Sequence, residues 1–128
     1  MVDGAALRRI TLAIGFAFAS GGPVAQAADP AAGKSVFNSY CSICHSAQAG
    51  KNMVGPSLFG VVGRPTGSVA GFHYSPANQN AHLTWDQATL DKYLASPRTV
   101  IPGTTMTYGG LKDDTKRADL IAYLATLK

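Results

Sequence analysis

The 128-residue sequence contains only two cysteines, no glutamate and no basic run with interleaved aromatic residues. A structural zinc site normally needs four cysteine or histidine ligands, and His73 and His82 have no finger-like spacing from the cysteines, so zinc binding is disfavoured. The missing basic run argues against a nucleic-acid-binding surface. Any specialised chemistry must therefore come from a few residues, and both cysteines lie in one short motif.

Long hydrophobic runs are also missing, and the one apolar stretch lies near the N-terminus. Arg8-Arg9 is followed by an uncharged apolar run over residues 10–20 and by the sequence AQA, which matches the A-x-A pattern of a cleavage site. The run is shorter than the roughly 18–20 residues needed to span a membrane. We predict an export signal in residues 1–27, cleaved after Ala27, and a periplasmic domain in residues 28–128. An uncleaved membrane anchor is the alternative.

The predicted mature domain is small and mildly basic. With 46% hydrophobic and 14% charged residues, the composition is typical of one globular domain. Loss of Asp3, Arg8 and Arg9 from totals of 11 basic and 7 acidic residues leaves nine against six, a formal charge of +3. About 101 residues can form a modest core, which a large apolar cofactor would enlarge.

The five residues Cys41-Ser42-Ile43-Cys44-His45 form a CxxCH motif. Two thiols separated by two residues can each form a thioether with one vinyl group of a haem, and the histidine that follows then lies beneath the iron. A dithiol redox motif would follow a strand, whereas the preceding sequence is helical in pattern. A disulfide across so short a loop would constrain little of the unfolded chain. Covalent haem attachment is the favoured interpretation.

The remaining sequence predicts helices joined by long loops. Asp29-Pro30 predicts a helix start, and small or apolar residues then recur at spacings of three and four. Glycines and prolines predict a looped segment over residues 46–80. Thr84, with Gln87 three residues later, predicts the cap of a helix that stops before Pro97, and Asp113 or Asp114 predicts the cap of a last one. Residues 101–106 are expected to be extended. The apolar face of the first helix comprises Gly33, Val36, Phe37, Tyr40, Cys41 and Cys44. The face of the second comprises Leu90, Tyr93 and Leu94, and that of the last comprises Leu120, Ile121, Tyr123, Leu124 and Leu127.

A six-coordinate haem needs a second axial ligand opposite His45. The candidates are Met53, Met106, His73 and His82. Met53 follows His45 too closely to cross easily to the far side of the ring, whereas Met106 lies in a loop bounded by proline and glycine that can reach it. Most methionines only fill cores, so the haem itself is what favours Met106.

Five motifs, taken together, resemble a class I cytochrome c, and the resemblance covers nearly all of the predicted mature chain. They are CSICH, GPSLFGVVGR at residues 55–64, Tyr74 with LTW at 83–85, IPGTTM at 101–106 and DLIAYL at 119–124. The mitochondrial-type branch and its soluble bacterial relatives are the most similar. The resemblance implies an all-α fold of three to five helices, with long loops wrapped around one covalently bound haem c.

The same resemblance implies roles for individual residues. Cys41 and Cys44 would hold the haem, and His45 would be the proximal ligand, with its other ring nitrogen hydrogen-bonded to the Pro56 carbonyl. Met106 would be the distal ligand. Arg64, Tyr74 and Trp85 would bind the inner haem propionate, and Asn78, Tyr93 and Thr104 would form a polar cluster near the methionine. Gly33 and Phe37 would meet Leu120 and Tyr123 where two helices cross.

The function implied is that of an electron carrier and not of an enzyme. Partners would be redox proteins such as a quinol-oxidising bc complex, a terminal oxidase, a reaction centre or a periplasmic dehydrogenase, and the carrier would be monomeric. A haem sensor or a dedicated subunit of a larger oxidoreductase is the alternative. Many relatives carry lysines around the exposed haem edge, and here several of these are replaced, so weaker electrostatic steering is expected. The replaced positions are Tyr40, Thr99 and Thr105, and the retained basic ones are Lys51, Arg98 and Lys112.

Overall fold

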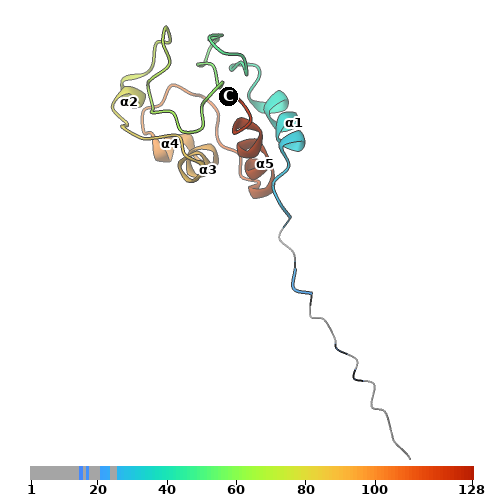
Figure 1. The fold of residues 1–128 in the computed structure, drawn as a ribbon. Helices are drawn as coiled ribbons and strands as arrows, with labels where there is room; N and C mark the ends of the chain where they lie inside the picture. Colours follow the sequence, from blue (N-terminus) through green and yellow to red (C-terminus); the bar gives the residue numbers. More distant parts are fainter. Residues whose placement is uncertain (1–14, 16, 18–20, 24–25) are drawn as a thin grey trace, which may run out of the picture.

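The computed structural model describes residues 15, 17, 21–23 and 26–128. Most of the predicted export signal lies outside these residues. Five helices form the described part: α1 (Pro30–Tyr40), α2 (Pro76–Gln79), α3 (Gln87–Ala95), α4 (Pro97–Val100) and α5 (Asp114–Leu124) (Figure 1). Over the same described residues the chain has no strand beyond an isolated antiparallel bridge between Pro65 and Thr84. None of the helices in this part is long and apolar enough to cross a membrane.

Helix α1 begins as predicted and packs across α5. The Asp29 carboxylate accepts a hydrogen bond from the Ala31 amide at 2.8 Å, and Pro30 is the first helical residue. At Gly33 the two backbones come so close that an added Cβ would lie 1.9 Å from the Asp119 carbonyl oxygen. The rings of Phe37 and Tyr123 pack with centroids 5.5 Å apart. The predicted crossing of the first and last helices is therefore confirmed.

Helix α3 starts two residues later than Thr84 predicts. Its cap is Asp86, whose carboxylate accepts a hydrogen bond from the Thr89 amide at 2.7 Å. Thr84 is instead held extended in its bridge to Pro65, and the next residue, Trp85, donates its amide to the Arg64 carbonyl at 2.9 Å. Pairing with the 63–66 segment thus keeps residues 83–85 out of the helix, and the predicted Thr84 cap is wrong.

The other expected elements agree more closely with the structure. Asp113 caps α5 by accepting from the Lys116 amide at 2.9 Å, and Asp114 lies in the first turn. The predicted loop over residues 46–80 is interrupted only by the single turn of α2. The short helix α4, which Pro97 begins, was not expected. The prediction that residues 101–106 are extended is wrong at its start, because residues 101–104 form a turn in which the Thr104 amide donates to the Ile101 carbonyl at 3.1 Å and Gly103 has a φ of 86°. Residues 104–106 are non-helical as predicted.

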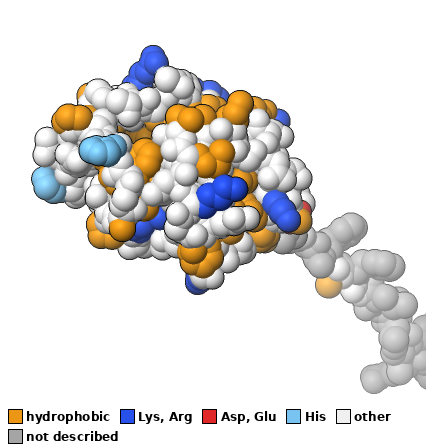
Figure 2. Space-filling model, turned by 90° about the horizontal axis from the view of Figure 1, so that it is seen from above, with side chains coloured by type: hydrophobic (Ala, Val, Ile, Leu, Met, Phe, Trp, Pro, Cys, Tyr) orange, Lys and Arg blue, Asp and Glu red, His pale blue; other side chains and the backbone are white. Residues whose placement is uncertain are grey.

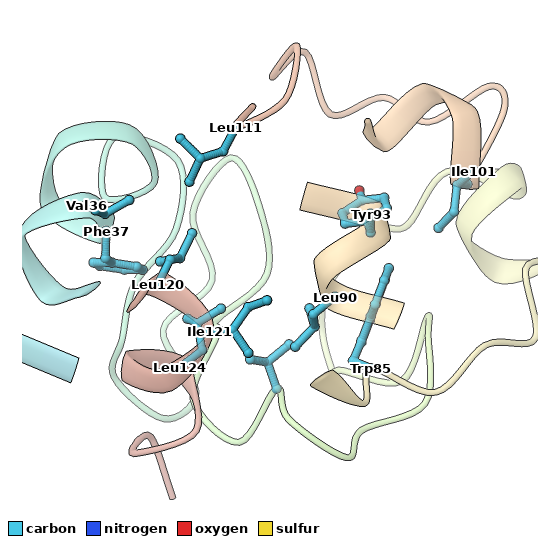
Figure 3. Close-up of a cluster of buried hydrophobic side chains, with 11 residues drawn as sticks. Val36, Phe37, Trp85, Leu90, Tyr93, Ile101, Leu111, Leu120, Ile121 and Leu124 are labelled. Carbon is cyan, nitrogen blue, oxygen red and sulfur yellow. The ribbon is translucent and has the colours of Figure 1, made fainter. Parts of the chain in front are cut away.

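The hydrophobic core joins the α1–α5 crossing to α3 and the segment before it (Figure 3). Helix α5 contributes Leu120, which is 1% exposed, and its neighbours Ile121 and Leu124 reach toward Leu90 on α3. On the far side of Leu90, the ring of Trp85 lies against Tyr93 with centroids 4.6 Å apart. The remaining core residues are Val36, Phe37, Val61, Ile101 and Leu111.

Candidate haem site

The CxxCH motif directly follows α1. Cys41 caps the helix, and the amides of Cys44 and His45 both donate to its carbonyl, at 3.0 and 2.9 Å. Both cysteines are free thiols of intermediate exposure. Burial, with the nearby Cys44 as a second cause, raises the pKa of the Cys41 thiol to about 11. A dithiol oxidoreductase needs a thiol with a lowered pKa, so this environment argues against that function.

The His45 side chain is fixed from two sides. Its Nδ1 lies 2.8 Å from the Pro56 carbonyl oxygen, which is the hydrogen bond that the family resemblance implies. Gly55 packs against the ring so closely that an added Cβ would lie 2.2 Å from Cε1. Burial lowers the pKa of the imidazole, although the hydrogen bond to Pro56 opposes this shift. The ring is therefore neutral at pH 7 with its proton on Nδ1, and Nε2 can act as a metal ligand.

Met106 lies beside two of the residues predicted to accompany it. The Tyr93 hydroxyl donates to the Met106 sulfur at 3.7 Å, and the Met106 amide donates to the Thr104 hydroxyl at 3.2 Å. Burial raises the pKa of Tyr93, whereas a hydrogen bond from Thr104 opposes the rise. The phenol is thus protonated at neutral pH, and Tyr93, Thr104 and Met106 form one cluster.

The other candidate axial ligands lie in different surroundings. Met53 is 42% exposed, and its amide bonds to the Gly55 carbonyl at 2.9 Å, which places it on the His45 side of the site. His73 and His82 are exposed. Among the described residues other than glycine, only His82 has a positive φ, of 51°.

Arg64 lies near the Tyr74 phenol, and backbone pairing brings Trp85 to the same place. Arg64 Nη1 donates to the carbonyls of Ser57 and Phe59, both at 3.1 Å, but its Nε is buried without a hydrogen-bond partner. Burial lowers the pKa of the guanidinium. A buried cationic donor without a partner costs free energy unless an acceptor reaches it.

The comparisons with known proteins agree on one family. The cytochrome c family model matches residues 30–128. The chain belongs to the class I cytochrome c family. It is 49% identical over 100 residues to a cytochrome c2 from Rhodopila globiformis, covering 78% of this chain and 94% of that protein. It is 53% identical over 88 residues to a cytochrome c2 iso-2 from Magnetospirillum molischianum, covering 69% and 91%.

A solved structure is similar along the same region. Cytochrome cH from Methylobacterium extorquens superposes with a TM-score of 0.72 and 45% identity, covering 77% of this chain and 98% of that one. As a member of the cytochrome c family, this chain binds haem c covalently, and Cys41 and Cys44 have the spacing of the attachment motif. It is an electron carrier and not an enzyme.

Two buried polar atoms fit such a haem. Apart from the Arg64 Nε, the side-chain oxygen of Asn78 is buried without a partner, and rotation of its amide would present a donor instead. A haem propionate is a carboxylate that can accept a hydrogen bond from the Arg64 Nε. Together with the free Nε2 of His45 and the two free thiols, the described residues therefore fit a covalently bound cytochrome c haem.

Several residues that organise the site were not identified from the sequence. Asn52 ties two loops together, since its amide nitrogen donates to the Ala70 carbonyl at 3.2 Å and its oxygen accepts from the Ser57 amide at 3.0 Å. The Ser57 hydroxyl in turn donates to the Gln48 carbonyl at 2.5 Å. No sequence signal marks Asn52. Gly55 could have been suspected, because it directly precedes the proline whose carbonyl holds His45.

Two open surface hollows lie away from this site. Both are beside α5 and include Ala28 and Ala118, with Asp91 in one and Asp114 and Asp119 in the other. None of the haem-site residues predicted from the sequence lines either hollow. Neither hollow is therefore part of the haem site.

Proposed function

We propose that this cytochrome c is an exported, periplasmic single-haem electron carrier in which His45 and Met106 are the two axial ligands of the iron. The observation that carries the proposal is the fixed His45 ring. Its Nδ1 is occupied by the Pro56 carbonyl at 2.8 Å and its pKa is lowered by burial, so neutral Nε2 is free to bind iron. Cys41 and Cys44 hold the haem next to this ring through two thioethers.

Met106 would supply the second ligand. The Tyr93 hydroxyl beside its sulfur restrains the side chain and uses one of the sulfur lone pairs, which leaves the other for the iron. Thr104 fixes the Met106 backbone through its hydroxyl. Because a thioether is a soft ligand that favours ferrous iron, Met106 raises the reduction potential.

The bound haem supplies one-electron chemistry at its iron. With His45 and Met106 both bound, the chain leaves no coordination position for a substrate, so catalysis at the metal is disfavoured. Arg64, Tyr74 and Trp85 bind the inner propionate. The unpartnered Arg64 Nε supports this role, because a buried carboxylate needs charged or hydrogen-bonding partners.

Docking to redox partners uses apolar contact with a few positive charges. Ile43 in the attachment motif is 81% exposed and Val54 is 79% exposed, which is unusual for large apolar side chains. The sequence has no acidic residue between Asp29 and Asp86. On the face seen from above the loops, Lys and Arg side chains lie among hydrophobic ones and aspartate is visible only at the edge (Figure 2). Such a surface suits short-lived complexes with acidic partners.

The experiment that tests the ligand assignment compares two methionine variants. Met106→Ala should abolish the near-infrared methionine-to-iron absorption band, lower the potential and allow the reduced protein to bind carbon monoxide, whereas Met53→Ala should do none of these. Survival of the band without Met106 would contradict the proposal. Carbon monoxide binding by the unmodified reduced protein at neutral pH would favour a sensor or enzyme instead.

Two further measurements test the proposed location and docking. N-terminal sequencing of the exported protein should give Ala28 as the first residue, and recovery of residues 1–27 in a membrane fraction would favour an anchor. The second-order electron-transfer rate with the native partner should fall less than about tenfold from low to physiological salt, because few charge pairs are involved. A fall of about a hundredfold would show strong steering by the remaining basic residues.

A further inference from the structure

We propose that Arg117 is a positioning residue that keeps Met106 in place for the iron. This inference rests on the proposed ligation by Met106. Arg117 lies on α5, eleven residues from Met106, and is only 8% exposed although it carries a charge. Arginine side chains are rarely buried unless their N–H groups have hydrogen-bond partners. The partners of Arg117 therefore indicate which parts of the chain it connects.

The guanidinium of Arg117 joins three parts of the chain. Its Nε pairs with the Asp91 carboxylate of α3 at 2.6 Å, and Nη2 pairs with Asp114 at the start of α5 at 2.7 Å. Nη1 donates to the Leu111 carbonyl at 3.0 Å. The planar fork of arginine can serve these three partners at once, whereas the single ammonium of lysine cannot.

Leu111 is where the Met106 segment is anchored downstream. Among the described residues, no backbone–backbone hydrogen bond involves residues 105–110. The next residue, Leu111, is 6% exposed, donates its amide to the Leu94 carbonyl at 2.7 Å and gives its carbonyl to Arg117. Gly110 allows this close approach: its φ is +116°, and an added Cβ would lie 2.3 Å from the Ala95 carbonyl oxygen.

The segment that carries Met106 is therefore held at two ends. Upstream, Ile101 is 2% exposed and accepts from the Thr104 amide at 3.1 Å. Downstream, Arg117 and Leu94 hold Leu111. Loss of Arg117 would leave a buried carbonyl without its charged donor and release the downstream end, so the segment should open locally more often. Opening would move the Met106 sulfur away and would let an outside ligand reach the iron of the bound haem.

The test is a titration of the ferric holoprotein with imidazole, which competes with methionine for the iron, followed through the loss of the near-infrared band. Apparent imidazole affinity scales with the population of the open segment. We expect Arg117→Gln to raise this affinity about tenfold, and Arg117→Lys about threefold because one contact can be kept.

A control variant separates positioning from general stability. Ala118→Gly, at an exposed neighbouring position, weakens α5 without touching Leu111. It should leave the imidazole affinity within about twofold of the unmodified protein. An equal rise in Ala118→Gly and Arg117→Gln would overturn the proposal, because Arg117 would then act only through overall stability.

The remaining outcomes are equally decisive. An unchanged affinity in Arg117→Gln overturns the proposal. If that variant yields no holoprotein, a wild-type affinity in Arg117→Lys overturns it and a threefold rise supports it. Absence of the near-infrared band in the unmodified protein would mean that the ligation by Met106 fails, whereas a normal band with unaltered titrations would refute only the role of Arg117.

Discussion

The α1–α5 crossing and the looped half, defined as residues 41–85 and 101–112, are stabilised in different ways. At the crossing, helix backbones meet at Gly33 and apolar side chains such as Phe37 and Leu120 fill the contact. In the looped half, single side chains such as Asn52 and Arg64 hold distant carbonyls and amides. Among the described residues, the two buried side-chain polar atoms without a protein partner, on Arg64 and Asn78, also lie there.

This difference shows how a small domain can combine a firm scaffold with a cofactor site. Packing of apolar surface between helices is stable without other groups, since it depends only on removing that surface from water. Loops supply polar groups that can be aimed at a cofactor, but each hydrogen bond adds little net stability. The helical crossing should therefore tolerate loss of the haem better than the looped half does.

The largest expected effect comes from removing the haem attachment. Replacing both Cys41 and Cys44 by alanine should abolish most of the holoprotein yield in an exported expression system, and the apoprotein should be largely unfolded because the loops lose their core. Amide hydrogen exchange on any apoprotein measures what remains. Residual protection should be confined to α1 and α5. Recovery of a normally folded domain without haem would contradict the organising role of the motif.

The next largest effect is expected at the helix crossing. Gly33→Ala should destabilise the holoprotein by about 3 kcal/mol, because the new Cβ meets a backbone carbonyl that cannot turn aside. Urea unfolding measures the change. Gly109→Ala is the matched control, since nothing lies within 4 Å of its added Cβ, and it should change stability by less than about 0.5 kcal/mol. Equal losses of stability in the two variants would show that close backbone packing at Gly33 does not make the crossing sensitive to an added methyl group.

A smaller and more local effect is expected from Asn52→Ala in the looped half. The variant loses the hydrogen bonds to Ala70 and Ser57 and should lose about 1–2 kcal/mol of stability. Hydrogen exchange should become faster in residues 46–57 and 68–74 while α1 and α5 keep their protection. Uniform acceleration over the whole chain would show that the two halves open together rather than separately.

The smallest effect concerns the pH dependence of the α3 cap. Hydrogen bonds from Thr89 lower the pKa of Asp86 in the folded protein. The carboxylate should therefore contribute stability above the unfolded pKa of about 3.9, and this contribution is lost as the pH falls through the lower folded value. Asp86→Asn can still cap the helix without titrating. The stability difference between the two proteins should shrink on acidification, and a constant difference would refute the mechanism.

The sequence by itself determined the local features of this protein. The Asp29 cap, the apolar face of the last helix and the CxxCH motif depend on neighbouring residues and were recognised without coordinates. The glycine and proline content also indicated the long loops correctly. Residue roles such as those of Arg64 and Tyr93 came from the family resemblance and could not have been derived from spacing.

Only the tertiary structure decided features that depend on distant residues. Thr84 has the sequence of a cap, yet pairing with Pro65 draws it into an extended conformation and Asp86 caps α3 instead. The sequence around Arg117 does not distinguish it from an exposed charged residue on a helix. Its partners Asp91 and the Leu111 carbonyl come within hydrogen-bond distance only after α3 and α5 have packed. Local pattern predicted the three longer helices, because caps and periodicity act within a few residues. The partners of a buried polar side chain depend on the packing of the whole chain.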